Sequence, residues 1–217
     1  PDAAAAPLVI DDAAFGYGLE KDIFRHFSLT VAAGEMVTIT GRTGAGKSTL
    51  FKLILGLYQP REGQVRIFGC DPSRLAPAVR RQVFGYVEQQ FHAISGTVAD
   101  QISLKDPRVT AGAMEKALHL VGLWDTCCAL PQGLDTPFRP ELFSRGQSQL
   151  LSIARAVVMN PQILLFDEIT ANLDSLTESQ VLQALQAAAK DRTVLSISHR
   201  LYEAQGGRRV VIGETEA

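Results

Sequence analysis

The stretch GRTGAGKST at residues 41–49 decides the fold of this sequence. It matches the phosphate-loop pattern G-x-x-x-x-G-K-[ST] at every position, between a strand-like run at residues 36–40 and a predicted helix at residues 48–56. In this setting the glycines let successive backbone N–H groups turn inward around a phosphate chain, and the new helix directs its positive end at the same anion. The stretch therefore predicts a nucleotide-phosphate site between a strand and a helix.

The side chains of this loop have separate chemical tasks. Lys47 is expected to neutralise the β- and γ-phosphates of ATP, and to face solvent when no nucleotide is bound. The Ser48 hydroxyl is expected to ligate Mg²⁺, while Thr49 supports the helix start and the α-phosphate. The predicted nucleotide-binding residues of the loop are Gly41, Arg42, Thr43, Gly44, Ala45, Gly46, Lys47, Ser48 and Thr49.

A second stretch, in the C-terminal third of the chain, supplies two acids. Residues 163–166 are the apolar run ILLF, and Asp167 and Glu168 follow directly. Such a run is typical of a strand buried on both faces, and ligands of open α/β sheets bind at the carboxyl ends of the strands. Asp167 is predicted to hold Mg²⁺, directly or through water, and Glu168 to orient or deprotonate an attacking water. Apolar strands that end in an acid are common, so this interpretation depends on the phosphate loop.

The order of the predicted elements indicates an α/β fold. Strands and helices alternate after residue 144, as expected of a parallel sheet, and residues 90–140 are mostly helical. Within that middle part, Pro131–Pro140 is rich in proline and is predicted to be a loop. The predicted strands are residues 29–31, 35–40, 65–68, 163–166, 193–197 and 209–212, and the predicted helices are residues 48–56, 111–121, 148–159 and 177–189.

Length and composition exclude several classes of protein. The chain has 217 residues, of which 46% are hydrophobic, so it fits one domain with a sizeable core. Its formal net charge of −2 is unlike the strongly basic charge of nucleic-acid binders, and no nucleic-acid partner is expected. No apolar run approaches the roughly 20 residues of a membrane span. No basic and apolar signal peptide is predicted at the N-terminus.

The chain has three cysteines, Cys70, Cys127 and Cys128. An odd, low count argues against a disulfide framework and indicates a reducing compartment. Cys127 and Cys128 have no second cysteine pair or nearby histidine to complete a metal site. Cys127 and Cys128 are therefore expected to be buried structural residues.

Further short motifs resemble those of the ATP-binding cassette (ABC) transporter family. The signature L-S-G-G-Q of the family is similar to FSRGQ at residues 143–147, which ends 20 residues before Asp167. Residues 167–174, DEITANLD, resemble the end of the Walker B motif and the D-loop that follows it. His199 comes after the predicted strand at residues 193–197, as the switch histidine of the family does.

Two motifs earlier in the chain complete the resemblance. The run YVEQ ends at Gln89, which matches the Q-loop glutamine, and Tyr17 in the run FGY stands where the adenine-stacking aromatic does. Taken together, seven motifs from Tyr17 to His199 follow the family's order and cover most of the chain. Any one of the short motifs is weak, but their order and spacing are highly specific.

The resemblance implies a fold with a P-loop NTPase core. It predicts a mostly parallel sheet, an N-terminal antiparallel β part and an inserted helical subdomain that carries the signature. On this interpretation residues 1–217 are one ABC ATPase domain, with the helical subdomain at about residues 90–147. Residues 1–7 are alanine-rich and do not begin with Met, and they are interpreted as the remainder of a linker.

The resemblance also implies a mechanism in which two such domains pack head to tail. Each ATP then lies between the phosphate loop of one domain and the signature of the other, where Ser144 and the Gly146 N–H contact the γ-phosphate. His199 is expected to contact the same phosphate and hold the water, and Gln89 to report the nucleotide state to a membrane domain. The nucleotide-binding residues implied outside the loop are Tyr17, Ser144, Gly146, Gln147 and Asp174. The implied catalytic residues are Glu168, His199, Lys47 and Gln89, and the implied Mg²⁺ ligands are Ser48, Gln89 and Asp167.

The signature departs from the family pattern at two positions. Arg145 replaces the first glycine and Phe143 replaces the leucine, whereas Gly146 is kept. The site is expected to work, because Gly146 is the residue whose backbone must approach the phosphate closely. The segment after Thr136 is about two residues shorter than in typical exporters, and this leaves the coupling to a membrane domain open.

Three other short segments of the sequence resemble those of exporter-type domains. They are LPQGLDT at residues 130–136, GTV at residues 96–98 and ISHRL at residues 197–201. The leading hypothesis is therefore the ATPase domain of an ABC exporter, at the cytoplasmic face of a cell membrane and fused to an upstream transmembrane half. The alternatives are a soluble ABC ATPase that acts on nucleic acid or ribosomes, and a weakly hydrolysing half of a heterodimeric exporter. The second domain of the pair is either the same chain or a homologous one.

Overall fold

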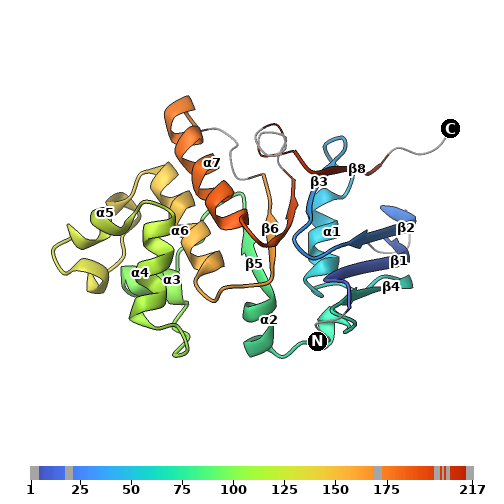
Figure 1. The fold of residues 1–217 in the computed structure, drawn as a ribbon, viewed down its shortest axis with the longest axis horizontal. Helices are drawn as coiled ribbons and strands as arrows, with labels where there is room; N and C mark the ends of the chain where they lie inside the picture. Colours follow the sequence, from blue (N-terminus) through green and yellow to red (C-terminus); the bar gives the residue numbers. More distant parts are fainter. Residues whose placement is uncertain are drawn as a thin grey trace.

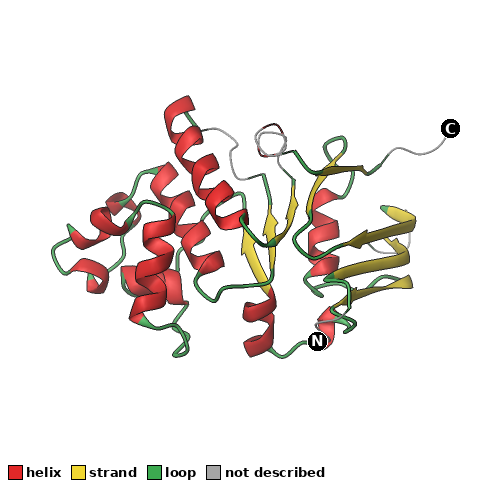
Figure 2. Ribbon diagram, in the orientation of Figure 1, coloured by secondary structure: helices red, strands yellow, loops and turns green. Residues whose placement is uncertain are grey.

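The computed structural model describes residues 5–17, 22–168, 173–197, 201, 203 and 206–213. Two sheets and a group of helices make up this part of the chain (Figures 1 and 2). The strands are β1 (Leu8–Phe15), β2 (Phe24–Val31), β3 (Met36–Thr40), β4 (Glu62–Ile67), β5 (Phe84–Val87), β6 (Ile163–Phe166), β7 (Thr193–Ser196) and β8 (Arg208–Val211). The helices are α1 (Lys47–Ile54), α2 (Pro77–Val83), α3 (Val98–Ser103), α4 (Ala111–Leu120), α5 (Trp124–Cys128), α6 (Arg145–Val157) and α7 (Ser175–Ala189).

The larger sheet is parallel, as predicted. Its five strands lie in the order β5-β6-β7-β3-β8, and each neighbouring pair is parallel. Every residue of β6 and β7 is buried, and this explains why β6 appears in the sequence as a short apolar run. Because β3 and β6 run in the same direction, the phosphate loop after β3 and the acids after β6 emerge at the same edge of the sheet.

The smaller sheet is the N-terminal antiparallel part, with the order β2-β1-β4. The sequence predicts only the ends of β2 and β4 and gives no bounds for β1. The reason is visible in the register of β1, which shifts between Ile10 and Ala13 against β2, so the apolar residues do not alternate regularly. Asp12 and His26 lie in this irregular part with positive φ angles of 47° and 49°.

The four helices predicted by range agree with α1, α4, α6 and α7 in their middle parts and differ at one or both ends, whereas α2 was not predicted. α4 matches the predicted helix almost exactly in extent, whereas α6 begins at Arg145, three residues before the predicted start at Ser148. Ser144 thus caps the helix, and the last three signature residues, 145–147, lie in its first turn and not in the loop before it. The predicted loop at Pro131–Pro140 contains a short 3₁₀ turn, Gly133–Asp135, and a second one begins at Pro140.

Two hydrophobic clusters form the core. One lies around α6, which packs against α7, α3 and α4, and the other lies between α1 and the antiparallel strands. Figure 1 shows α3 to α6 together on one side of the parallel sheet, and β1, β2 and β4 on the other side. The exact limits of the helical subdomain and of the linker at residues 1–7 stay predictions.

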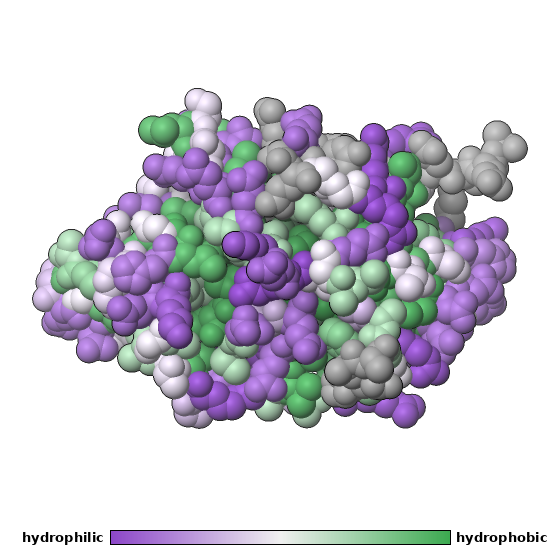
Figure 3. Space-filling model, viewed as in Figure 1, coloured by the Kyte–Doolittle hydropathy of each residue, from purple (hydrophilic) through white to green (hydrophobic). Residues whose placement is uncertain are grey.

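The surface is mostly polar. In the face drawn in Figure 3, hydrophilic residues cover most of the right-hand end, and hydrophilic and hydrophobic residues are interspersed elsewhere. Within the described residues, none of the helices combines the length and the apolar character that crossing a membrane requires.

The prediction of buried cysteines is right for one of the two residues it concerns, Cys127 and Cys128. Cys127 is buried, and burial raises the pKa of its thiol to about 11. Cys128 is exposed and Cys70 is partly exposed, so the prediction is wrong for Cys128. Successive residues of a helix point about 100° apart, and α5 therefore turns the thiol of Cys127 inward and that of Cys128 outward.

Candidate nucleotide-binding site

The phosphate loop joins β3 to α1 in a conformation that needs glycine. Gly41 and Gly46 have φ angles of 153° and 93°, in a region that side-chain-bearing residues rarely adopt. A Cβ on Gly46 would collide with the side chain of Ile23 and lie 2.9 Å from the ring of Phe24. The antiparallel part therefore packs directly against the loop. Glycine is required at residue 46 both by its positive φ angle and by the lack of space for a side chain.

Lys47 lies folded over the loop and does not face solvent as predicted. Its Nζ donates to the backbone oxygens of Gly41 at 3.0 Å and Arg42 at 3.2 Å, and its side chain is only 14% exposed. The carbonyl groups of the turn attract the ammonium group, which explains the difference. The same nitrogen lies 4.0 Å from Oε1 of Glu168, so the cation sits between the loop and the end of β6.

Asp167 and Ser48 meet across the site although they are 119 residues apart in the chain. The Ser48 hydroxyl donates to Oδ1 of Asp167 at 3.4 Å, and the Asp167 residue is only 8% exposed. A hydroxyl and a carboxylate are hard oxygen donors, which suit Mg²⁺ when nucleotide phosphates and waters complete its coordination. Within the described residues no group of three or more His, Cys, Asp or Glu side chains gathers to hold a metal alone. The residues present therefore fit a magnesium ion that is bound together with a nucleotide.

Tyr86 touches the other oxygen of the same carboxylate. Its hydroxyl donates to Oδ2 of Asp167 at 3.1 Å, from the end of the neighbouring strand β5. Burial raises the pKa of Tyr86 far above its usual value, and the charge of Asp167 raises it further, so the phenol stays protonated and donates. The sequence predicts no role for Tyr86, because only the pairing of β5 with β6 brings its hydroxyl to Asp167.

Glu168, two residues after the end of β6, has a strained backbone. Its φ angle of 44° lies in the left-handed region, which costs a residue other than glycine about 1–3 kcal/mol. This conformation turns the side chain, 46% exposed, toward the Lys47 ammonium group. Strain of this kind persists where the surroundings fix it, and its place beside a phosphate loop favours a functional role.

Tyr17 lies beside the phosphate loop with half of its surface open. The residue is 49% exposed, and its hydroxyl shares a hydrogen bond of 3.1 Å with the Thr49 hydroxyl. The rings of Phe15 and Tyr58 meet the ring of Tyr17 edge-on or nearly so, with centroids 5.3 Å and 5.5 Å away. An exposed, supported aromatic ring next to the loop fits the predicted contact with adenine.

The signature forms a capping box at the start of α6. The Ser144 hydroxyl accepts from the Gln147 N–H at 3.2 Å, and Gln147 Oε1 accepts from the Ser144 N–H at 2.9 Å. Gly146 is buried, and a Cβ at this position would collide with the Thr177 methyl group of α7. The glycine is thus required by the packing of two helices, in addition to the predicted approach to a phosphate.

The two departures in the signature have separate explanations. Phe143 is buried and stacks on Phe138, with ring centroids 5.9 Å apart. Arg145 is exposed and lines a cavity of about 380 Å³ together with Gln89 and Ser148. Its side chain therefore lies on the face of α6 that is turned toward the Q-loop segment, and not on the Gly146 face.

The same helix holds the segment after β5. The Gln149 side-chain amide donates to the backbone oxygen of Gln89 at 2.6 Å. Arg155 donates to the backbone oxygen of His92 at 2.9 Å, and its guanidinium carbon lies 4.5 Å from the centre of the Phe91 ring. Burial lowers the pKa of Arg155 to about 10, so the side chain still carries its charge at neutral pH. The predicted metal contact of the exposed Gln89 side chain stays a prediction.

The remaining predicted residues are partly placed. Asp174 caps α7, where its Oδ1 accepts from the Thr177 N–H at 3.0 Å, and this hydrogen bonding lowers the pKa of its carboxyl group. His199 and the run at residues 169–172 lie outside the described residues. The roles of Asp174 and His199 at a nucleotide stay predictions.

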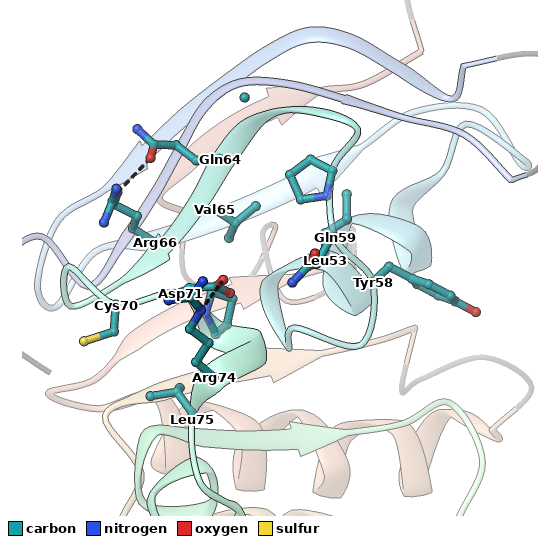
Figure 4. A pocket seen from close by; sticks show the side chains of 13 residues that line it. Leu53, Tyr58, Gln59, Gln64, Val65, Arg66, Cys70, Asp71, Arg74 and Leu75 are labelled. Carbon is teal, nitrogen blue, oxygen red and sulfur yellow. Dashed lines mark hydrogen bonds and ion pairs between the residues drawn. The ribbon is translucent and has the colours of Figure 1, made fainter.

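A separate cavity of about 620 Å³ shares only Tyr58 with the site residues described above. Figure 4 shows it between β4, the end of α1 and the 3₁₀ turn Pro72–Arg74. Its polar side chains are partly paired with one another, for example Arg66 with Gln64 at 3.0 Å. The cavity contains none of the residues that the sequence predicts to be functional.

Comparisons with known proteins agree with this geometry. The model of the family described as "ABC transporter" matches residues 24–171. An ATM1-type heavy metal exporter of Novosphingobium aromaticivorans is 37% identical over 196 residues, which are 89% of this chain and 32% of the relative. The alpha-hemolysin translocation ATP-binding protein HlyB of Escherichia coli O157:H7 is 35% identical over 192 residues, which are 88% of this chain and 27% of the relative. The chain thus spans about a third or less of the length of these curated relatives.

A solved structure shares the whole fold. The structure of a bacterial Atm1-family ABC exporter with ATP bound covers 98% of this chain, with a TM-score of 0.81 and 34% sequence identity, and the match spans 39% of that exporter chain. The agreement extends over the parallel sheet, the antiparallel sheet and the helices, and it confirms the predicted P-loop NTPase fold. The chain belongs to the ABC transporter family, as an ATP-binding domain of the exporter type.

Proposed function

We propose that this chain binds ATP together with Mg²⁺ and hydrolyses it, as the motor domain of a membrane exporter. The observation that carries the proposal is the meeting of Lys47 and Ser48 with Asp167 and Glu168 at one edge of the parallel sheet. A cation, a hydroxyl and two carboxylates are the groups that phosphoryl transfer to water requires.

Binding uses the loop and the side chains around it. The inward N–H groups of residues 41–49 hold the phosphate chain, and the Lys47 ammonium exchanges the loop carbonyls for phosphate oxygens. The exposed ring of Tyr17 stacks on the adenine. Ser48 and Asp167 would hold Mg²⁺, with Gln89 as a further ligand, and the ion would supply positive charge to the phosphate chain.

Hydrolysis uses the acid at the end of β6. Glu168 orients a water and accepts its proton as the water oxygen attacks the γ-phosphorus, and the bond to the β-phosphate oxygen breaks. Lys47 remains close to the developing negative charge on the leaving phosphate. His199 contacts the γ-phosphate and helps to hold the water in place.

The signature serves the ATP of a second domain. The start of α6 presents Ser144 and the first N–H groups of the helix, at its positive end, which attracts an anion. Gln147 and Asp174 complete this second face of the nucleotide. The pairing is head to tail, and the partner is an identical or homologous domain.

The names of the relatives describe export of heavy metal and translocation of hemolysin. By analogy, an upstream transmembrane half holds this domain at the cytoplasmic face of a membrane and selects the substrate. ATP binding then closes the pair of domains, and hydrolysis reopens it.

Assembly tests the proposal most directly. Glu168→Gln keeps the hydrogen-bonding shape of the side chain but removes the base, so it retains the ATP that bridges two chains. Size-exclusion chromatography with light scattering is expected to show a dimer of this variant with Mg-ATP and a monomer with Mg-ADP. Glu115→Gln, a change of the same type on the exposed side of α4, should behave as the unchanged chain, which is expected to remain largely monomeric.

Two outcomes would revise the proposal. Failure of the unchanged chain to bind Mg-ATP would contradict it entirely. A monomer under every condition, with ATP shown to be bound, would contradict the homodimer and leave a homologous chain as the partner.

A further inference from the structure

The carboxylate of Asp167 is held from both sides. Ser48 donates to Oδ1 at 3.4 Å from the phosphate loop, and Tyr86 donates to Oδ2 at 3.1 Å from β5. Strands β5 and β6 are paired in parallel, with Tyr86 opposite Leu165, so the tyrosine ring extends past the end of β6 to reach the acid. The two hydroxyl groups thus define the rotation of the carboxylate about its last bond.

The tyrosine ring is itself fixed. It meets the ring of Phe51 edge-on, with centroids 6.3 Å apart and an angle of 83° between the planes. Phe51 is fully buried in α1, the helix that begins at the phosphate loop. An aromatic side chain has only two rotatable bonds, so this packing leaves the hydroxyl little freedom to leave Asp167.

We propose that Tyr86 is a positioning residue for the magnesium site, because its hydroxyl occupies Oδ2 of Asp167 and leaves Oδ1 turned toward Ser48 and the metal. This inference rests on the proposed binding of ATP with Mg²⁺ by the same residues. Tyr86 does not touch the nucleotide or the metal; it acts only through the carboxylate.

The consequence is specific to the magnesium-dependent part of ATP binding. When the hydroxyl is removed, the carboxylate can rotate and must be reoriented before it serves the metal. Contacts of the loop with the phosphates and of Tyr17 with the base do not depend on this orientation. The role of Tyr86 should therefore disappear when the metal is removed.

Tyr86→Phe tests this directly, because it removes the hydroxyl and keeps the ring on Phe51. The dissociation constant of a fluorescent ATP analogue is measured for this chain with excess Mg²⁺ and again with EDTA. The gain in affinity from Mg²⁺ is expected to fall by roughly tenfold, near the lower end of what a hydrogen bond to a charged group contributes. The affinity in EDTA is expected to stay within about twofold, since the phosphate contacts are unchanged.

Thr38→Val is the matched control. Thr38 lies in β3 of the same sheet, is fully buried, and its hydroxyl has no hydrogen-bond partner among the described residues. This substitution also removes one buried hydroxyl without changing the shape of the side chain much, and it should leave the effect of Mg²⁺ unchanged. The melting temperature of both variants without nucleotide reports whether they fold as the unchanged chain does.

A double mutant distinguishes a positioning role of the Tyr86 hydroxyl from a role in packing. In Asp167→Asn, whose amide does not replace the carboxylate at Mg²⁺, adding Tyr86→Phe is expected to have no further effect on the gain from the metal. An unchanged or larger Mg²⁺ gain in Tyr86→Phe alone, or an equal loss of affinity in EDTA, overturns the inference. If the unchanged chain itself shows no Mg²⁺ gain, the proposed function fails, and the two failures are thereby distinguished.

Discussion

The phosphate loop and the signature are both anion-binding helix starts, yet the structure supports them in different ways. At the phosphate loop, side chains from β5, β6 and α1 converge on one point, with Lys47 beside Glu168 and Ser48 beside Asp167. At the signature, Ser144 and Gln147 bond to each other, and the helix start is buried only at Gly146. The phosphate-loop site is assembled from several elements of one chain. The signature residues Ser144 and Gln147 bond to each other and lie at the surface.

Mutations at the phosphate loop and at the signature are therefore expected to have different effects. A change at the phosphate loop should weaken binding by a single chain. A change at the signature should leave that binding intact and act on the paired state, unless it disturbs the packing of α6 on α7. The predictions below run from the largest expected effect to the smallest.

Gly146→Asp should have the largest effect, because the signature meets the core at this residue. A side chain there collides with Thr177, and a carboxylate is forced into a buried position. We expect a loss of about 2–4 kcal/mol in the free energy of unfolding, measured with urea, and loss of ATPase activity. Arg145→Asp places the same carboxylate side chain at the neighbouring exposed position and should leave stability nearly unchanged. Equal stability of the two variants would show that the contact with Thr177 imposes no constraint.

Lys47→Ala should abolish hydrolysis and weaken ATP binding more than about 100-fold, because a charge-assisted contact with the phosphates is lost. The lost hydrogen bonds to Gly41 and Arg42 should lower stability by only about 1 kcal/mol, so circular dichroism should remain native. Calorimetric titration with ATP measures the affinity. Lys52→Ala, near the other end of α1, is the control and should bind ATP normally. Normal turnover of Lys47→Ala would contradict the assignment of the site.

Asp174→Ala should cause a moderate loss of stability that depends on pH, because Asp174 caps the helix on which Gly146 packs. Hydrogen bonding to Thr177 holds the pKa of Asp174 below its usual 3.8. A lowered pKa means that the cap stabilises the fold above the unfolded value and that this contribution disappears as the pH falls through the folded value. Urea unfolding of both chains from pH 6 to pH 3 should therefore show a difference that shrinks only in the most acidic samples. A difference that is independent of pH would indicate that the carboxylate charge is not involved.

Arg145→Gly should have the smallest effect. The side chain lies toward Gln89 and Ser148, away from the face that Gly146 buries. ATPase activity is expected to change less than about tenfold, or roughly 1.4 kcal/mol. Steady-state turnover of the two signature variants, compared at equal protein concentration, decides the point. Equal damage from Arg145→Gly and Gly146→Asp would show that the arginine is itself part of the active machinery.

Much of the fold is visible in the sequence because it depends on local chemistry. The glycine pattern before Lys47 specifies a turn with positive φ angles, and the apolar run at residues 163–166 specifies a buried strand. The start of α6 was also readable, since Ser144 and Gln147 have the spacing of a capping box, but that signal was missed. β1 gave no clear signal, because its bulged register disrupts the alternation on which a strand prediction depends.

The sequence alone determined which residues stand at the phosphate loop and at the end of β6, because each motif is a short run whose chemistry is complete in itself. Only the tertiary structure decided that Tyr86 touches Asp167, that Lys47 folds onto the loop, and that Gly146 is required by α7. Those facts depend on the register between parallel strands and on the distance between two helices. Both are set by the packing of residues far apart in the chain, and no local pattern of residue types records them.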